Sequence, residues 1–334
     1  MIPSKKRAAR VFVPVNQRSQ RKAKTLQIRN VLVATDFSRA SIQAFRAALP
    51  LLKHFGAELH LVHVLIHEPI GGLIEIPMVM SDAELKEHAR HRLHQMATKY
   101  SVPLRPKNVH VPYGRPFEQI CQLARDLNVD IIVTSTRGNT GLKHLALGST
   151  AERVVRYSPC PVLVVRSGNR RGKTGRKTFR KILIPIDFSE CSIKGLNYAK
   201  ALARRFHAKL LLHHSIALQY YFANDEYKRH DFPGLVRWAE KTAREQMREL
   251  VQRTQWDQVK VETAVDMGHA GQHICDRAKD SDIDLIVTST HGRTGFKHIL
   301  LGSTAEYVVR HAPCSVLVVP SHERTVATST EKRS

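Results

Sequence analysis

One segment of this chain occurs twice. Residues 130–165 read DIIVTSTRGNTGLKHLALGSTAERVVRYSPCPVLVV, and residues 284–319 read DLIVTSTHGRTGFKHILLGSTAEYVVRHAPCSVLVV, with about 26 of 36 positions identical. A repeat of this length indicates two structural units of one kind. Each copy passes from an apolar stretch through a loop with glycines to a helix start, and α/β proteins hold phosphate groups in that order. The repeat therefore constrains both the architecture and the chemistry.

The length of 334 residues suits two domains of about 150 residues each. Hydrophobic residues make up 42% of the chain and charged residues 25%, as in ordinary globular proteins. We expect no membrane span, because no apolar run approaches the roughly 18 residues that a span needs. The first residues show no apolar core with a cleavage site, so we do not expect secretion.

The cysteines indicate a reducing compartment. Four of the five occupy corresponding places in the repeat, Cys121 with Cys275 and Cys160 with Cys314, while Cys191 stands alone. Corresponding residues of two domains normally lie far apart, and the chain contains no CxxC motif. We expect free, buried thiols and a cytoplasmic protein.

The net charge of +24 is concentrated in two segments. Residues 1–29 contain nine Lys and Arg, residues 166–181 contain eight more, and neither segment contains an acid. Both are poor in periodic apolar residues, which is typical of solvated tails and linkers. The alternative is an electrostatic tether for nucleic acid or an anionic surface, which would bind without sequence specificity and with strong salt dependence.

These patterns divide the chain into five parts. We expect a basic arm at residues 1–28, a first domain at 29–167, a basic linker at 168–179, a second domain at 180–320 and a tail at 321–334. In each domain, short Val- and Ile-rich stretches alternate with longer amphipathic ones. Among them we expect a strand at residues 107–111 and helices at residues 82–99 and 238–253. The pattern predicts an α/β fold of two tandem doubly wound domains, each a five-stranded parallel sheet with helices on both faces.

Both domains end their first expected strand with an acid, Asp36 in VLVATDFS and Asp187 in ILIPIDFS. If strands one and four are neighbours, this carboxylate faces the loop after strand four across the crevice where such sheets bind ligands. It could accept ribose hydroxyls or hold a divalent cation between phosphates. The alternative is that it only stabilises the turn or caps the next helix, with help from Ser38 and Ser189.

The repeated loop has a fixed spacing of glycines. Ser135 is followed by Gly138 and, after nine more residues, by Gly148, Ser149 and Thr150. Corresponding residues in the second copy are Ser289, Gly292, Gly302, Ser303 and Thr304. Glycines let the backbone approach an anion, and the amide groups and dipole of a helix start attract it.

A structural alternative exists for the same residues. Ser149 with Glu152, and Ser303 with Glu306, have the S-x-x-E spacing of a capping box, which begins many helices. Anion binding and capping can both hold, because a cap can yield its donors to a ligand.

Three motifs together resemble the universal stress protein family. They are the DFS turn after strand one, the loop that ends in Gly-Ser, and the closing strand PCPVLVV. The resemblance covers both halves of the chain, and it implies a tandem of two Usp domains that pack through their closing strands as a pseudo-twofold pair. It leaves open a homodimer of whole chains.

ATP-binding members of that family carry the motif Gly, two residues, Gly, nine residues, Gly, then Ser or Thr. By position the second glycine is Gly138 or Gly292, the third is Gly148 or Gly302, and the hydroxyl residue is Ser149 or Ser303. Ser135 and Ser289 stand where the first glycine would be. Each adds a Cβ atom where the backbone would approach the nucleotide.

The resemblance also implies the ligand, which is ATP or AMP, with Mg²⁺ held through the phosphates. It implies an adenine contact from the backbone at the end of strand two, on Val64 and Ser215, and contacts from Thr35, Asp36, Ile186 and Asp187. Because Val64 and Ser215 differ, the two halves are expected to differ in affinity.

We expect a binding module with little or no hydrolysis rather than an enzyme. The loop lacks the lysine of a Walker motif, and no acid or amide is evidently placed to orient an attacking water. We expect no metal site of its own in the chain: His88, His91 and His94 read as a solvated helix face, and His63 and His214 as hydrogen-bonded core residues.

Two functions of different kinds follow. The first is an adenine-nucleotide-binding regulatory module of the stress response. The alternative is a scaffold that binds no nucleotide and acts through its basic segments on nucleic acid or protein partners.

Overall fold

The computed structural model describes residues 26–66, 81–136, 148–166, 179–217, 232–292 and 301–321. Strands and helices alternate in each half, as the sequence predicts. The first half contains β1 (Asn30–Ala34), α1 (Arg39–Phe55), β2 (Glu58–Val62), α2 (Asp82–Lys99), β3 (Val109–His110), α3 (Pro116–Asp126), β4 (Ile131–Ser135), α4 (Ser149–Tyr157) and β5 (Val162–Val165).

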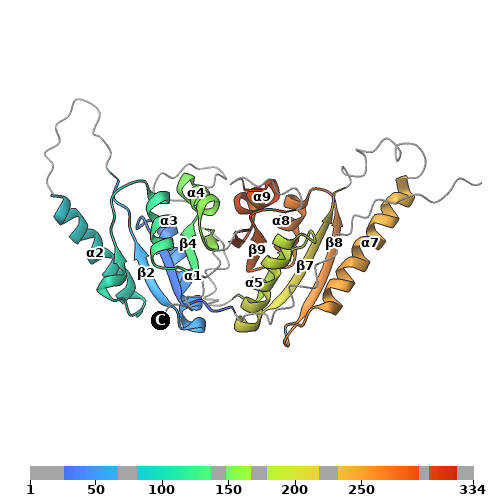
Figure 1. Cartoon of the computed structure of the whole chain (residues 1–334), viewed down its shortest axis with the longest axis horizontal. Coiled ribbons are helices and arrows are strands. Elements are labelled where there is room, and N and C mark those ends of the chain that lie inside the picture. Colours follow the sequence, from blue (N-terminus) through green and yellow to red (C-terminus); the bar gives the residue numbers. More distant parts are fainter. Residues whose placement is uncertain are drawn as a thin grey trace, which may run out of the picture.

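The second half repeats this order. It contains β6 (Lys181–Pro185), α5 (Glu190–Phe206), β7 (Lys209–Ile216), α7 (Phe232–Arg253), β8 (Val261–Met267), α8 (Ala270–Asp280), β9 (Leu285–Ser289), α9 (Ser303–His311) and β10 (Ser315–Val319). Figure 1 shows the first half on the left and the second on the right, with α2 and α7 at the two ends.

All the strands join one ten-stranded sheet in the order β3-β2-β1-β4-β5-β10-β9-β6-β7-β8. Pairing is parallel within each half, as predicted for doubly wound domains, and antiparallel where β5 meets β10. Leu163 lies directly opposite Leu317 in that central pair. The expectation that the halves pack through their closing strands is confirmed.

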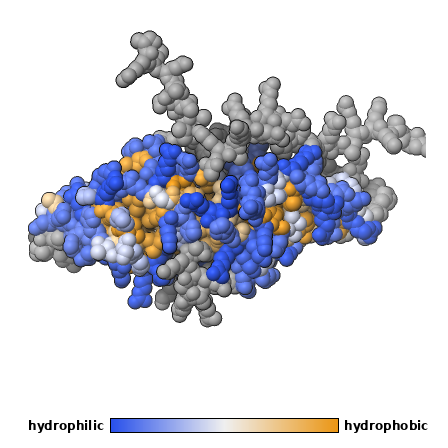
Figure 2. Space-filling model, turned by 90° about the horizontal axis from the view of Figure 1, so that it is seen from below, coloured by the Kyte–Doolittle hydropathy of each residue, from blue (hydrophilic) through white to orange (hydrophobic). Residues whose placement is uncertain are grey.

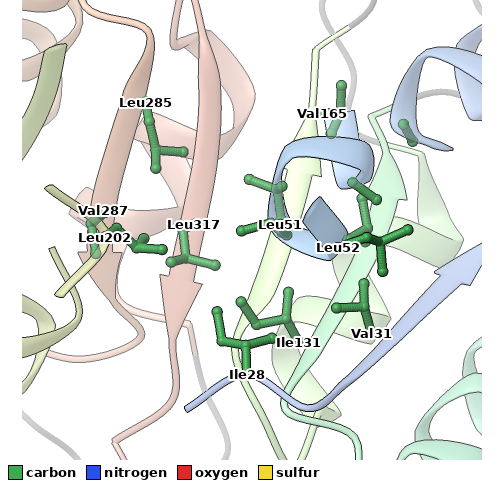
Figure 3. Close-up of a cluster of buried hydrophobic side chains, with 14 of the residues drawn as sticks. Ile28, Val31, Leu51, Leu52, Ile131, Val165, Leu202, Leu285, Val287 and Leu317 are labelled. Atoms are coloured by element: carbon green, nitrogen blue, oxygen red, sulfur yellow. The ribbon is translucent and has the colours of Figure 1, made fainter. Parts of the chain in front are cut away.

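Apolar side chains fill both faces of the sheet. On one face, side chains of α1, α2, α5 and α7 cover the strands, and on the other those of α3, α4, α8 and α9 do so. Each of these two clusters contains residues from both halves. Figure 3 shows the first, where Leu317 and Leu285 of the second half lie across from Ile131 and Val165 of the first. The two halves therefore share one hydrophobic core.

The described surface is mostly hydrophilic. Seen from below in Figure 2, hydrophobic areas are interrupted by hydrophilic side chains. Among the described residues, the large hydrophobic side chains that are exposed are those of Ile66, Tyr157 and Trp238.

Two elements differ from the expected pattern. The expected strand at residues 107–111 is reduced to the two residues of β3, because a 3-10 helix occupies Pro106–Asn108 and Pro112 lacks a backbone N–H group for further pairing. Helix α7, expected from Trp238, begins six residues earlier at Phe232.

Candidate functional site

The strand order creates one crevice in each half. β1 pairs with β4, with Val31 opposite Ile131, and β6 pairs with β9, with Ile182 opposite Leu285. The predicted neighbourhood of strands one and four is therefore confirmed. Since parallel strands end at the same edge, the turn after β1 and the loop after β4 leave the sheet side by side, as do their counterparts after β6 and β9.

The turn at this edge is strained in the same way in both halves. Phe37 has a φ of 63° and Phe188 a φ of 64°, which is the left-handed region. A bulky residue adopts it only at a cost of about 1–3 kcal/mol. Strain of this kind is concentrated at functional sites, and here the same strain occurs at both copies of the turn.

The acid before each strained residue holds the turn together. Asp36 accepts a hydrogen bond from the Ser38 N–H group at 3.0 Å. Asp187 accepts two through Oδ1, from the N–H group of Ser189 at 3.0 Å and from its hydroxyl at 2.6 Å. The helix caps themselves are Ser38 and Ser189. Each acid therefore stabilises its turn by hydrogen bonding, which is the structural role named for it above.

The other oxygen of Asp187 faces the loop after β9. A Cβ atom added to Gly292 would lie 2.6 Å from Asp187 Oδ2, closer than a carbon and an oxygen can approach. Gly292 thus leaves room for this carboxylate, and the structure brings these two predicted residues together. The corresponding Gly138 of the first half lies outside the described residues.

Helices α4 and α9 begin at the crevice without a side-chain cap. Their N-cap residues are Gly148 and Gly302, so Ser149 and Ser303 are the first helical residues, and neither cap makes a side-chain hydrogen bond among the described residues. The predicted capping box is therefore wrong, because a Ser can act in it only from the N-cap position. At such a start the first N–H groups have no acceptor within the helix itself.

A side chain at the second of these starts would be tightly packed. Gly302 donates its N–H group to the carbonyl of Thr290 at 2.8 Å, and a Cβ atom on it would lie 3.2 Å from that same oxygen. Gly148 makes the equivalent bond to Thr136, also at 2.8 Å. Thr150 and Thr304 follow in the first turn of their helices.

The two serines that replace the family glycine lie at the ends of β4 and β9. Ser135 is 8% exposed. Ser289 donates its hydroxyl to the carbonyl of His291 at 2.8 Å, so this side chain helps to shape the first residues of the loop.

A half-buried histidine, His63, and a buried one, His214, fix the residues before the acids. The ring Nδ1 of His63 lies 2.9 Å from the carbonyl oxygen of Thr35, and that of His214 lies 2.6 Å from the carbonyl oxygen of Ile186. A carbonyl can only accept, so each Nδ1 carries the proton. Burial lowers the pKa of His63 despite this bond. The prediction of hydrogen-bonded core histidines is confirmed.

The residues at the end of strand two differ between the halves. Val64 packs against the apolar cluster on one face of the sheet. The hydroxyl oxygen of Ser215 is buried and has no hydrogen-bond partner among the described residues. The two sites are thus different at the position where the resemblance implies a base contact.

Inspection of the sequence missed Arg92. It projects from α2, and its guanidinium group lies 3.9 Å from the centre of the Phe37 ring, beside the turn that carries Asp36. A cation here adds positive potential to the first crevice. An exposed arginine on an amphipathic helix gives no sequence signal of this contact.

Matches to known proteins establish the family. The model of the Universal stress protein family matches residues 27–166 and again residues 178–320. The chain belongs to the universal stress protein family. It is a tandem member, with the family domain present twice.

Single-domain relatives match about two-fifths of the chain each. A universal stress protein of Methanocaldococcus jannaschii is 33% identical over 142 residues, which cover 41% of this chain and 82% of that protein. One from Synechocystis is 32% identical over 156 residues, covering 42% of this chain and 97% of that protein.

A solved structure shows the same two-domain fold. The universal stress protein of Archaeoglobus fulgidus superposes with a TM-score of 0.62 at 21% identity, covering 89% of this chain and all of that one. At this identity the likeness concerns the fold alone.

Two further features were checked in the described part of the chain. None of its helices is long and apolar enough to cross a membrane. It contains no group of three or more His, Cys, Asp or Glu arranged to hold a metal ion.

Proposed function

We propose that this universal stress protein binds an adenine nucleotide, ATP or AMP, in the crevice of each half and acts as a regulatory module. The observation that carries the proposal is the pair of uncapped helix starts. Among the described residues neither α4 nor α9 has a side-chain cap, and both helices start at the edge where a carboxylate leaves the neighbouring strand. Such a start attracts phosphate through N–H groups and the helix dipole.

The hydroxyl residues of the first turn extend this donor set. Ser149, Thr150, Ser303 and Thr304 follow the cap glycines directly, so their side chains are available beside the amides. Two hydroxyl groups beside the first-turn N–H groups of each helix suit the non-bridging oxygens of a nucleotide phosphate.

The acid of each turn suits the rest of the ligand. Asp187 has one oxygen engaged by Ser189 and the other at the glycine loop. That second oxygen can accept a ribose hydroxyl, or it can serve as a hard oxygen ligand for the Mg²⁺ that accompanies ATP. Binding with little hydrolysis is consistent with a loop that lacks the Walker lysine.

A stability assay with a matched pair of variants tests the proposal. Wild-type protein should gain several degrees of thermal stability in millimolar ATP with Mg²⁺, because a ligand at about 100 times its Kd adds about 2.7 kcal/mol. Gly292→Ala, which displaces the Asp187 carboxylate, should lower the calorimetric stoichiometry from two nucleotides to one. Gly195→Ala, the same change on α5 beside Ile184, should leave it at two.

The proposal is contradicted by a wild-type protein whose melting temperature does not move in millimolar ATP or AMP. Equal binding by wild-type and Gly292→Ala protein would show that the second crevice is not a nucleotide site.

A further inference from the structure

The two ends of the sheet are unequally protected. β3 ends the first half with two paired residues. A short edge strand is one way in which proteins keep sheet edges from pairing. β8 ends the second half with seven residues in register with β7, from Val261 to Met267, and without proline. Figure 1 shows β8 as the outer strand on the right, beside α7.

The outer side of β8 carries a row of backbone groups. Lys260 accepts a bond from Leu210 of β7 through its carbonyl, and Gly268 donates one to Ile216 of β7. Backbone groups of alternate residues point to the same side of a strand, so residues 260, 262, 264, 266 and 268 face β7. The N–H and C=O groups of Val261, Thr263 and Val265 therefore face away from the sheet.

The middle of this strand is open on both faces. Glu262 and Thr263 are exposed, although they point to opposite faces of the sheet. Helices α7 and α8 flank the strand on its two sides: Val265 packs with the apolar side chains of α7, and Asp266 pairs with Arg277 of α8. Neither helix covers the strand centre.

Charge selects one way of pairing this edge with a second copy. An antiparallel register centred on Thr263 places Lys260 opposite Asp266 of the other copy, twice, and Glu262 opposite Ala264. Sliding the second strand by two residues in one direction places Glu262 opposite Glu262. Sliding it by two residues in the other direction places Glu262 opposite Asp266. Like charges directly opposite destabilise a sheet, and opposite charges stabilise it.

The same register satisfies the backbone. It pairs Thr263 with Thr263 and Val261 with Val265, which are the residues whose N–H and C=O groups face outward. Directly opposed residues of this class exchange both hydrogen bonds. The Lys260 and Asp266 side chains then lie at the positions between, where side chains of antiparallel strands are closest.

We propose that β8 is a self-association surface, on which a second copy of this chain adds its own β8 in the antiparallel register centred on Thr263. The resulting dimer has a continuous sheet across a twofold axis at Thr263. This interface lies at the far end of the second half from β10, so it adds to the pairing of the two halves within one chain. It does not depend on nucleotide binding.

Sedimentation velocity of the full chain, from about 1 to about 500 µM, tests the proposal. A single added strand makes a small interface, so the expected dimer dissociates in the micromolar range. Thr263→Pro should abolish it, since the missing N–H group faces outward and the ladder with β7 stays intact. Thr263→Val should keep it, since a β-branched side chain remains.

Charge variants test the register itself. Lys260→Glu should weaken the dimer about tenfold or more, because two attractive pairs become repulsive. Lys107→Glu makes the same charge change near the opposite edge of the sheet, beside Glu58, and should leave the dimer unchanged. Ala264→Lys should tighten it, because only in this register does the new lysine face Glu262.

A chain that stays monomeric over the whole range overturns the proposal. So does a dimer that neither Thr263→Pro nor Lys260→Glu weakens. If the proline variant does not fold, as judged by its circular dichroism, the Lys260→Glu and Ala264→Lys results decide.

Discussion

The two halves differ, residue by residue, in their buried histidines. In the first half, Nδ1 of His60 lies 3.3 Å from Nε2 of His110 across β2 and β3. The sheet register places Leu211 and Ala264 at the corresponding sites of the second half. Burial lowers the pKa of His110 to about 4, aided by the charge of His60, and burial also lowers the pKa of His60.

This pair makes stability depend on pH. The unfolded chain binds protons near the ordinary histidine pKa of 6.5, whereas the folded pair resists protonation, so folding favours the neutral rings. Its contribution is fully present above pH 6.5 and is lost as the pH falls toward 4. In wild-type protein the free energy of unfolding should therefore fall between pH 6.5 and pH 4. In the double variant His60→Leu/His110→Ala this fall should be smaller by on the order of 2 kcal/mol, as measured by urea denaturation.

The second half supplies the comparison. His213 there donates through Nε2 to the Asp266 carboxylate at 2.8 Å, and Arg277 donates to the same carboxylate at 2.6 Å. His213→Val, which copies Val62 of the first half, leaves the His60 and His110 pair intact, so the share of the pH dependence that this pair contributes should remain. It removes the share of His213, whose pKa burial also lowers. An identical pH profile for wild-type and double-variant protein would show that the pair does not titrate as described.

The candidate site could be predicted in part from single residues. The sequence alone located Asp187 and Gly292 because strand ends and glycine spacing are local signals. Their contact at the crevice, and the positive φ of Phe188, arise from tertiary packing that no local pattern encodes. The prediction for Ser149 was wrong. Its spacing to Glu152 fits a capping box, but helix α4 already begins at Ser149, so Ser149 is not the N-cap residue that a capping box needs.

Among the elements, α4 and α9 connect the two candidate sites. Both start at a crevice, and Arg310 of α9 pairs with Glu152 of α4 and with Glu306 of its own helix, each at 3.0 Å. Arg156 also pairs with Glu152, at 3.2 Å. Glu152, which was expected to cap α4, thus pairs with Arg310 of the other half.

Removing Arg310 should weaken the junction between these helices. The pairs are partly exposed, so we expect Arg310→Ala to lower the free energy of unfolding by about 1 kcal/mol in chemical denaturation. Arg156→Ala removes only a pair within one helix and should cost less, about 0.3–0.5 kcal/mol. Equal losses for the two variants would argue against the contact between the halves.

Sequence periodicity predicted most elements because their apolar faces repeat regularly. Helix α2 has the expected bounds, Asp82 to Lys99, since Ser81 and Glu84 form a true capping box at its start. Strand β3 was predicted too long. Pro112 limits a strand only where the neighbouring strand would pair with the missing N–H group, and the sequence does not show which strand that is. The start of α7 was predicted too late, since its first turn lies ahead of the periodic part.

On the scale of the whole molecule, the central strands make one cooperative unit. Leu317 is 2% exposed, lies opposite Leu163 and belongs to a core cluster with residues of both halves. We expect Leu317→Ala to cost about 2–5 kcal/mol. Hydrogen exchange should then accelerate in β1 and β4 of the first half as well as in β9. Acceleration confined to the second half would mean that the halves unfold independently.

If both crevices bind an adenine nucleotide, the purified protein should carry it. Native mass spectrometry of the protein purified without added nucleotide, followed by identification of the released ligand, measures this. We expect chains that carry ATP or AMP, up to two per chain, and at most one per chain in Gly292→Ala protein. Chains that carry no nucleotide, and acquire none after incubation with millimolar ATP and Mg²⁺, would contradict it.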